Sequence, residues 1–194
     1  MKLKPFYQGK LDVFCAIYAV LNALRLTHGL RTLKAREILN DTLLGLSSNP
    51  AAFRAVLNQE TDYIYLVDNL LAIVARRYPL EVVRPFVAAD FPSVDTFWQA
   101  CDAWLNSGGE AIPNRAIVMR FSRFDKIGEP PLVRHWTTVD SMTSQMLHLF
   151  DSSHEAESIQ NLARDKVATR NHEIDEKHRL LLQPDSARFL RLPF

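Results

Sequence analysis

The sequence predicts an α+β fold, with a mainly helical first half followed by a mainly antiparallel sheet. Between Phe14 and Asn106, apolar residues recur at the three- and four-residue spacing of helices. After Gly108 and Gly109 the apolar residues alternate or form short runs, which is typical of strands. Helices that come first and strands that come later favour an α+β arrangement over alternating parallel units.

The first half of the chain contains the expected helices. The segment from Phe14 to His28 is apolar on nearly every face, so we expect a buried central helix that ends at Gly29. Cys15 then lies in the first turn of this helix. Further helices are expected over Lys34–Leu44, Pro50–Leu57, Asp62–Arg77 and Val94–Asn106.

The second half contains the expected strands. They cover Ala116–Phe121, His135–Val139, Met146–Phe150, Arg179–Leu182 and Arg188–Leu192. Turn residues separate the second strand from the third at Thr143–Ser144, and the last two at Pro184–Ser186. The segment from His154 to His178 is polar and mixed in charge, so we expect a mobile excursion that adds little to the core.

Composition limits the class of protein. A chain of 194 residues, 47% hydrophobic and 23% charged, can bury one core, so residues 1–194 are expected to form a single domain. The net charge is only +1, which argues against nucleic acid or an anionic membrane as a partner. The longest apolar run is too short to cross a bilayer, and the N-terminus lacks the apolar run of a cleaved signal peptide. We expect a cytoplasmic protein, or one exported without a cleaved signal.

The chain has two cysteines, too few for a disulfide framework or a thiolate zinc site. Cys15 opens the predicted central helix, where unpaired N–H groups and the helix dipole favour a thiolate. The same N–H groups can hold an oxyanion, with the Gln8 side-chain amide as a second donor. Cys101 lies between aromatic residues and is expected to pack in the core. We expect no metal and no cofactor.

A thiol nucleophile needs a base, and the base needs an orienting partner. His135 begins one predicted strand and Asp151 follows the next. In an antiparallel hairpin the start of one strand lies beside the end of its successor, so these two side chains can meet. Trp136, next to the histidine, either lines the cleft or packs as a core aromatic.

Two alternatives involve other polar residues of the same region. Asp140 is a second candidate to orient the histidine, although it lies at the far end of the strand that His135 begins. His148, Asp151 and His154 suggest a metal site, but in a strand His148 and Asp151 point to opposite faces.

These residues resemble a known family. Four features follow one another along the chain: Gln8, then Cys15 at the start of a long apolar helix, then His-Trp-Thr-Thr-Val from His135, then a hydrophobic strand that ends in Asp151-Ser. This order is similar to that of papain-like cysteine peptidases, especially their compact bacterial C39-like branch. The resemblance implies a papain-like fold in which Gln8 supplies the oxyanion hole, Cys15 attacks, His135 is the general base and Asp151 orients it.

The resemblance also implies an activity. It predicts a thiol hydrolase that cleaves an amide bond in a peptide or protein substrate through a thioester on Cys15. The alternatives are a glutamine deamidase or transglutaminase-like enzyme, in which water or an amine resolves the same thioester, and a catalytically silent module that binds a peptide. The excursion from His154 to His178 leaves the fold just after Asp151, so we expect it to gate or recognise substrate.

Overall fold

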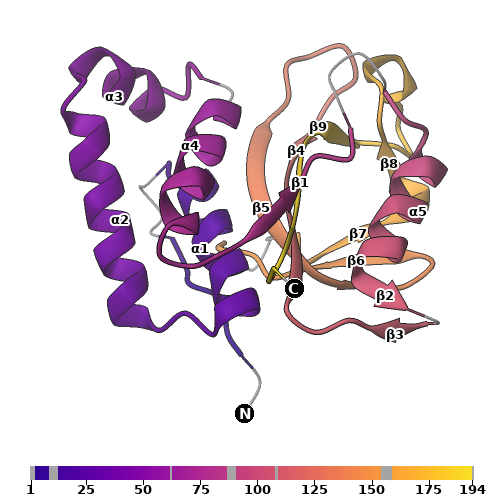
Figure 1. Cartoon of the computed structure of the whole chain (residues 1–194). Coiled ribbons are helices and arrows are strands. Elements are labelled where there is room, and N and C mark those ends of the chain that lie inside the picture. The colour runs from indigo at the N-terminus through magenta and orange to yellow at the C-terminus, as the bar shows by residue number, and fades with distance from the viewer. Residues whose placement is uncertain are drawn as a thin grey trace.

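The computed structural model describes residues 3–8, 13–61, 63–86, 91–107, 109–153 and 159–193. Within these described ranges, four helices lie on one side of a mostly antiparallel sheet and a fifth lies on the other side (Figure 1), so the predicted α+β class is confirmed. The helices are α1 (Cys15–His28), α2 (Thr32–Ser47), α3 (Pro50–Leu57), α4 (Ile64–Ala75) and α5 (Val94–Leu105).

The main sheet has the strand order β1-β9-β4-β5-β6-β7, and the short strand β8 pairs with β9 in parallel. A separate hairpin joins β2 to β3. The strands are β1 (Glu81–Val83), β2 (Asn106–Ser107), β3 (Glu110–Ala111), β4 (Arg115–Arg123), β5 (Val133–Met142), β6 (Met146–Leu149), β7 (Asn161–Ala163), β8 (Val167–Ala168) and β9 (Leu180–Arg191).

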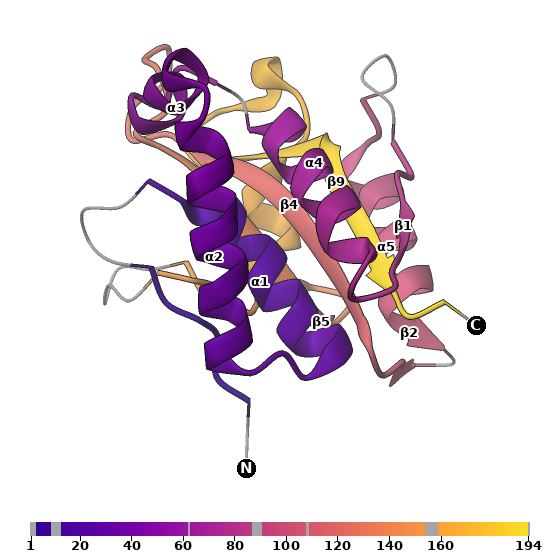
Figure 2. The same cartoon turned by 60° about the vertical axis from the view of Figure 1, so that its left-hand side comes forward.

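The central helix α1 ends at His28 as predicted, begins one residue after the predicted Phe14, and lies across the middle of the sheet (Figure 2). Its C-cap residue Gly29 has a φ of 64°, the left-handed conformation that glycine adopts without penalty. Thr138 in β5 donates a hydrogen bond of 2.7 Å to the Ala19 carbonyl of α1. This bond ties the middle of the helix to the strand that carries His135.

The two faces of the sheet bury separate hydrophobic clusters. One face packs against α1, and its cluster, which includes Trp136, extends to residues of α2 and α4. The other face packs against α5 and buries Ile117, Met119 and Phe121. Successive residues of a strand point to opposite faces, which explains why neighbours along β4 and β5 enter different clusters.

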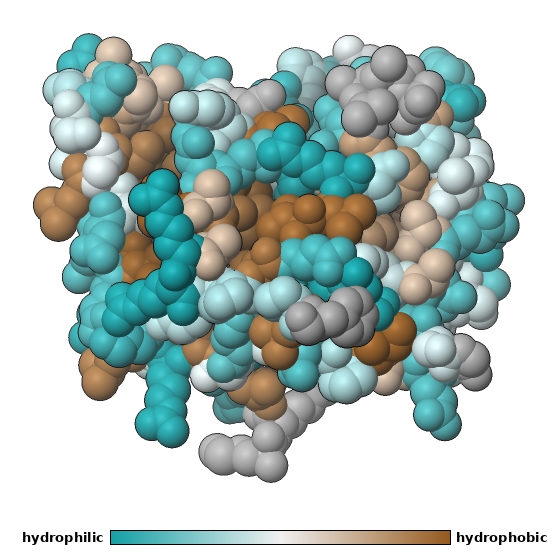
Figure 3. Space-filling view, in the orientation of Figure 1, coloured by the Kyte–Doolittle hydropathy of each residue, from teal (hydrophilic) through white to brown (hydrophobic). Residues whose placement is uncertain are grey.

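Figure 3 shows one side of the molecule in space-filling form. Apolar side chains form a band across the middle of this side, where the helical half meets the sheet, and hydrophilic side chains lie above and below it. No helix in the described ranges is long and apolar enough to span a membrane.

The predicted turn at Pro184–Ser186 is wrong. Residues 180–191 form the single strand β9, and this turn sequence is instead a bulge within it. Val118 pairs with Arg188 while Arg120 already pairs with Gln183, so the extra residues of β9 loop out of the ladder. The Ser186 hydroxyl accepts the hydrogen bond of the Arg120 amide at 2.8 Å and replaces the missing strand partner.

The expected polar excursion is also largely wrong. Residues 154–158 lie outside the described residues, but residues 159–178 contain β7, β8 and two 3-10 turns, at Arg164–Lys166 and Asn171–Glu173. Leu162, Val167 and Ala168 are buried, and the first two belong to the cluster under α5. A few apolar residues at the correct spacing are therefore enough to dock this polar segment on the sheet.

Candidate functional site

The candidate site lies where the N-terminus of α1 meets β5. Phe14 is the N-cap of α1, and its carbonyl accepts the amide hydrogen bonds of Ile17 and Tyr18, which fixes Cys15 as the first helical residue. Cys15 is partly exposed, whereas Cys101 is fully buried in α5. Burial raises the pKa of Cys101, so its thiol stays protonated and unreactive.

His135 and Asp151 meet at the edge of β5. After β6 ends, the chain continues beside β5, and the Phe150 amide donates to the Thr138 carbonyl at 2.7 Å. This path brings the Asp151 carboxylate to His135, and the His135 Nε2 to Asp151 Oδ2 distance is 2.8 Å. Both side chains are largely buried, at 12% and 6% exposed.

Two other groups hold Asp151 in place. Thr137 donates a hydrogen bond to the same carboxylate oxygen as His135, and the Ser153 amide donates to the other oxygen at 2.8 Å. Burial alone raises the pKa of Asp151, but the hydrogen bond and charge of His135, with those from Thr137 and Ser153, outweigh burial and lower it. The carboxylate is therefore ionised at neutral pH.

The charge state of His135 follows from its two partners. Burial alone lowers its pKa, but hydrogen bonds and charges from Asp151 and Cys15 outweigh burial and raise the pKa to about 10. The ring is thus placed between the carboxylate and the thiol, and it carries a proton at neutral pH. Phe121 packs edge-on against the ring, with centroids 5.7 Å apart, and shields one side of it.

Gln8 lies beside the residue that follows Asp151. Its backbone N–H donates to the Ser152 carbonyl at 3.0 Å, and the Ser152 hydroxyl donates to the side-chain oxygen Gln8 Oε1 at 3.1 Å. Two residues earlier, the Phe6 amide donates to the buried Asn22 side chain at 2.6 Å, and Asn22 Nδ2 donates back to the Phe6 carbonyl. The N-terminal segment therefore connects α1 with the loop that carries Asp151.

The alternatives from the sequence do not converge on this site. Asp140 accepts a hydrogen bond from the neighbouring Ser141, and His135 bonds to Asp151 instead. His148 Nδ1 lies 2.6 Å from Asn161 Oδ1, while Asp151 faces His135, so these two do not form a shared metal site. His154 lies outside the described residues.

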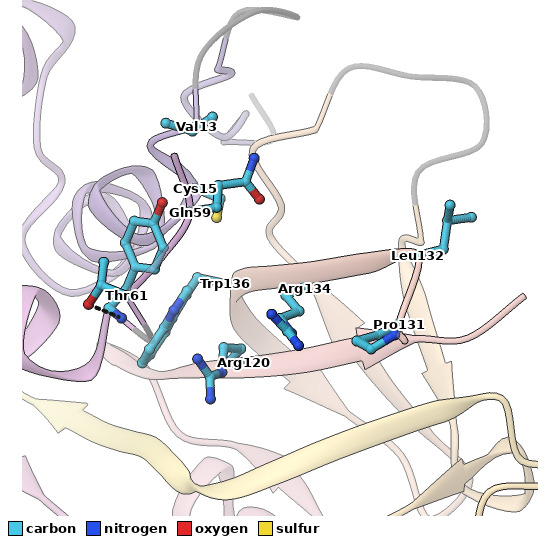
Figure 4. Close-up of a pocket in the computed structure, with 10 residues that line it drawn as sticks. Val13, Cys15, Gln59, Thr61, Arg120, Pro131, Leu132, Arg134 and Trp136 are labelled. Carbon is cyan, nitrogen blue, oxygen red and sulfur yellow. Dashed lines mark hydrogen bonds between the residues drawn. The ribbon is translucent and has the colours of Figure 1, made fainter. Parts of the chain in front are cut away.

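A pocket of about 120 Å³ opens beside Cys15 (Figure 4). Cys15, Gln59 and Tyr63 line it from the helical half, and Trp136 lines it from β5. Such a pocket is smaller than the roughly 300–1,000 Å³ of sites for drug-sized ligands, so it suits one side chain rather than a large cofactor. Trp136 is both a core residue, at 1% exposed, and a lining residue of the cleft.

Sequence reasoning missed several of these residues. Thr137 is two positions after His135, and the two-residue period of a strand places both side chains on one face. This spacing could have predicted that Thr137 lies beside His135. Tyr63 has a pKa raised to about 12 by burial and by the charge of Cys15, yet no local pattern distinguishes it from other helix-flanking tyrosines. Gln59 follows α3 and gives no sequence signal of its proximity to the cysteine.

No protein-family model matches the sequence, and a search of curated proteins found no similar protein. The resemblance to papain-like peptidases therefore stays a prediction.

Proposed function

We propose that this protein is a papain-like thiol hydrolase that cleaves an amide bond in a peptide or protein through a thioester on Cys15. The observation that carries the proposal is the arrangement of His135. Its ring bonds to the buried carboxylate of Asp151 and shares a hydrogen bond with the thiol at the start of α1. A nucleophile, a base and an orienting group in this order are the parts of a catalytic triad.

In the proposed reaction the Cys15 sulfur attacks the carbonyl carbon of the substrate amide, and the C–N bond breaks. His135 donates its proton to the leaving amine, so that a thioester remains on the sulfur. Water then attacks the thioester carbon while His135 accepts a proton from it, and the C–S bond breaks. The acid leaves, and the Cys15 thiolate and the protonated His135 ring are restored. Asp151 keeps the ring oriented, and we assign the Gln8 amide to the oxyanion with the N–H groups at the start of α1.

Selective alkylation tests the nucleophile. Iodoacetamide at neutral pH should modify one cysteine of the native protein, and peptide mapping should identify Cys15. Cys101→Ala should retain this modification, whereas Cys15→Ala should abolish it. The same rate at Cys15 in native and denatured protein would contradict an activated thiol.

Product mass tests the reaction. The wild-type protein and Cys15→Ala are incubated with a bacterial peptide digest, and only the wild type should generate peptides with new termini. A mass gain of about one dalton without cleavage would instead indicate glutamine deamidation, since an amide becomes an acid. Alkylation of Cys15 without any new product would favour the silent peptide-binding module.

A further inference from the structure

The pocket beside Cys15 has a distinctive charge. Two arginines line it from adjacent strands, Arg120 from β4 and Arg134 from β5 (Figure 4). Arg120 is registered opposite Trp136 and Arg134 opposite Ser122, so both arginines belong to the face of the sheet that packs on α1. Among the described residues, no aspartate or glutamate lines this pocket.

Arg134 differs from the arginines of this protein that hold a carboxylate partner. Several others hold a carboxylate partner, as Arg188 holds Asp68 and Arg191 holds Glu81. Arg134 is exposed and forms no ion pair with any residue in the described ranges. With a net charge of only +1 for the whole chain, the positive potential here is a local property of the pocket.

A second observation also indicates a ligand. The indole Nε1 of Trp136 is buried and has no hydrogen-bond partner within the described part of the chain. A buried donor without an acceptor costs free energy, and such donors are rare in folded proteins. Trp136 lines the same pocket as Arg134, so an acceptor that enters the pocket lies close to both side chains.

We propose that this pocket is an anion-selective subsite that binds a carboxylate of the substrate next to the amide that Cys15 attacks. Arg134 provides the guanidinium, which pairs with a carboxylate through two parallel hydrogen bonds. Arg120 adds positive potential, and its Nε donates to the Gln183 side chain, which orients it. The inference rests on the proposed function, and it identifies the substrate class as acidic peptides.

Two small alkylating agents that differ in charge test the subsite. Iodoacetate carries a carboxylate and iodoacetamide carries a neutral amide in its place. In both reactions the Cys15 thiolate forms a bond to the methylene carbon and iodide leaves. The measured quantity is the ratio of the iodoacetate rate to the iodoacetamide rate at Cys15, obtained by mass spectrometry at low ionic strength.

We expect this ratio to be higher for Cys15 in the wild type than for the denatured protein. Arg134→Glu should lower it by about three- to tenfold, since a nearby charge is reversed in a partly exposed site. Arg134→Gln should lower it by a smaller factor. Arg123→Glu is the matched control, because it makes the same change in net charge on the opposite face of β4 and should leave the ratio unchanged. His135 is common to all these proteins, so its own attraction for iodoacetate cancels.

The outcomes separate this inference from the proposed function. Rapid alkylation of Cys15 with a ratio that Arg134→Glu and Arg134→Gln leave unchanged overturns the subsite and leaves the thiol hydrolase standing. An equal fall of the ratio in Arg123→Glu also overturns it, because net charge then explains the effect. Slow alkylation by both agents, no faster than in denatured protein, contradicts the proposed function itself. Circular dichroism of each variant confirms that the comparison is made on folded protein.

Discussion

Of its two partners, the Asp151 carboxylate contributes most to the protonated state of His135. Burial works against the imidazolium, and the hydrogen bond to Asp151 is the largest influence that restores it. Asp151 is therefore a positioning residue, and its replacement should change both the pKa and the orientation of the His135 ring. Thr137 and Ser153 hold the carboxylate from two further directions, so that its orientation does not depend on the histidine alone.

We therefore expect Asp151→Asn to lower the pKa of His135 below about 10, since burial then acts without the opposing charge. An NMR titration of the ring protons measures this. Cys15 alkylation at pH 7 should slow by at least about tenfold, because the positive charge of the His135 ring beside the sulfur is lost. Asp140→Asn is the matched control, since that carboxylate bonds to Ser141, and a similar change in both variants would contradict the assignment.

The pair of His135 and Asp151 makes the free energy of unfolding depend on pH in a defined range. The pKa of His135 is higher in the folded state than the ordinary value of 6.5, so its contribution is complete below about pH 6.5 and is lost as the pH rises toward about 10. The pKa of Asp151 is lowered from 3.8, so its contribution is lost as the pH falls below that value.

Urea unfolding of the wild type and His135→Gln tests this dependence. The difference in the free energy of unfolding should be largest near pH 5 to 6 and should shrink steadily from pH 7 to pH 10. His172→Gln, at an exposed site in a 3-10 turn, serves as the control for a histidine outside the site. A difference that stays constant from pH 6 to pH 10 would contradict the role of the His135 charge.

At the scale of single elements, the end of α3 has an unusual residue. The Gln59 amide donates to the Val56 carbonyl and the Glu60 amide donates to the Ala55 carbonyl, which is the pattern of a Schellman motif. The left-handed position in this motif is usually glycine, but here it is Gln59, with a φ of 56°. The side chain of this strained residue lines the pocket beside Cys15.

Gln59→Gly should therefore raise the free energy of unfolding by up to about 1 kcal/mol, because glycine adopts this conformation without a steric penalty. If the side-chain amide of Gln59 contacts substrate, as its position in the pocket implies, hydrolysis of peptides should fall in the same variant. Gly45→Ala in the last turn of α2, where the added methyl group meets no neighbour, provides a stabilising control that should leave hydrolysis unchanged.

The elements differ in how well the sequence predicted them. The end of α1 and both bounds of α3 were predicted correctly because their caps are local: Gly29 ends α1, and Asn49 accepts the Ala52 amide at the start of α3. The contact between His135 and Asp151 could also be predicted from the local sequence, because a short hairpin places the start of one strand beside the end of the next.

The bulge in β9 and the docking of residues 159–178 depend on partners far away in the chain. A Pro-Asp-Ser sequence is compatible with both a turn and a bulge, and only its pairing with β4 decides between them. Likewise, nothing local indicates that Leu162 and Val167 reach the cluster under α5. The pocket lining was missed for the same reason, because Gln59 and Arg134 meet only after the two halves pack.

The correction to residues 159–178 has a measurable consequence. Leu162 in β7 is fully buried, so Leu162→Ala should lower the free energy of unfolding by about 2–5 kcal/mol. Leu33→Ala, at a position 72% exposed on α2, should change it by less than about 0.5 kcal/mol. Equal, small effects in urea unfolding would show that this segment is a dispensable excursion after all.

At the scale of the whole molecule, the candidate site is assembled from two halves. Cys15 and Gln59 come from the helical half, whereas His135, Arg134 and Asp151 come from the sheet and its loops. Contacts between the halves therefore set how the thiol faces the ring. Besides α1, which packs across the sheet, an ion pair joins the halves: Arg188 of β9 binds Asp68 of α4 with two hydrogen bonds, of 2.7 and 3.1 Å.

This ion pair is the whole-molecule feature most open to a test. The Arg188 side chain is only 3% exposed, so Asp68→Ala leaves a buried charge without its carboxylate and should lower the free energy of unfolding by about 3–5 kcal/mol. Arg84→Ala is the matched control. It removes the other cation that pairs with Asp68, but Arg84 is 57% exposed and its loss should cost no more than about 1 kcal/mol.

The same variants test whether the halves position the site. If contacts between them set the approach of Cys15 to His135, Asp68→Ala should slow iodoacetamide alkylation of Cys15 under conditions where the protein is still folded. Leu162→Ala supplies the comparison, because it destabilises the protein from the opposite face of the sheet, away from the boundary between the halves. At equal remaining stability, set by temperature, the alkylation rate should fall in Asp68→Ala and remain near the wild-type value in Leu162→Ala. A parallel fall in both variants would mean that alkylation follows global stability, and that the ion pair supports the fold without positioning the thiol.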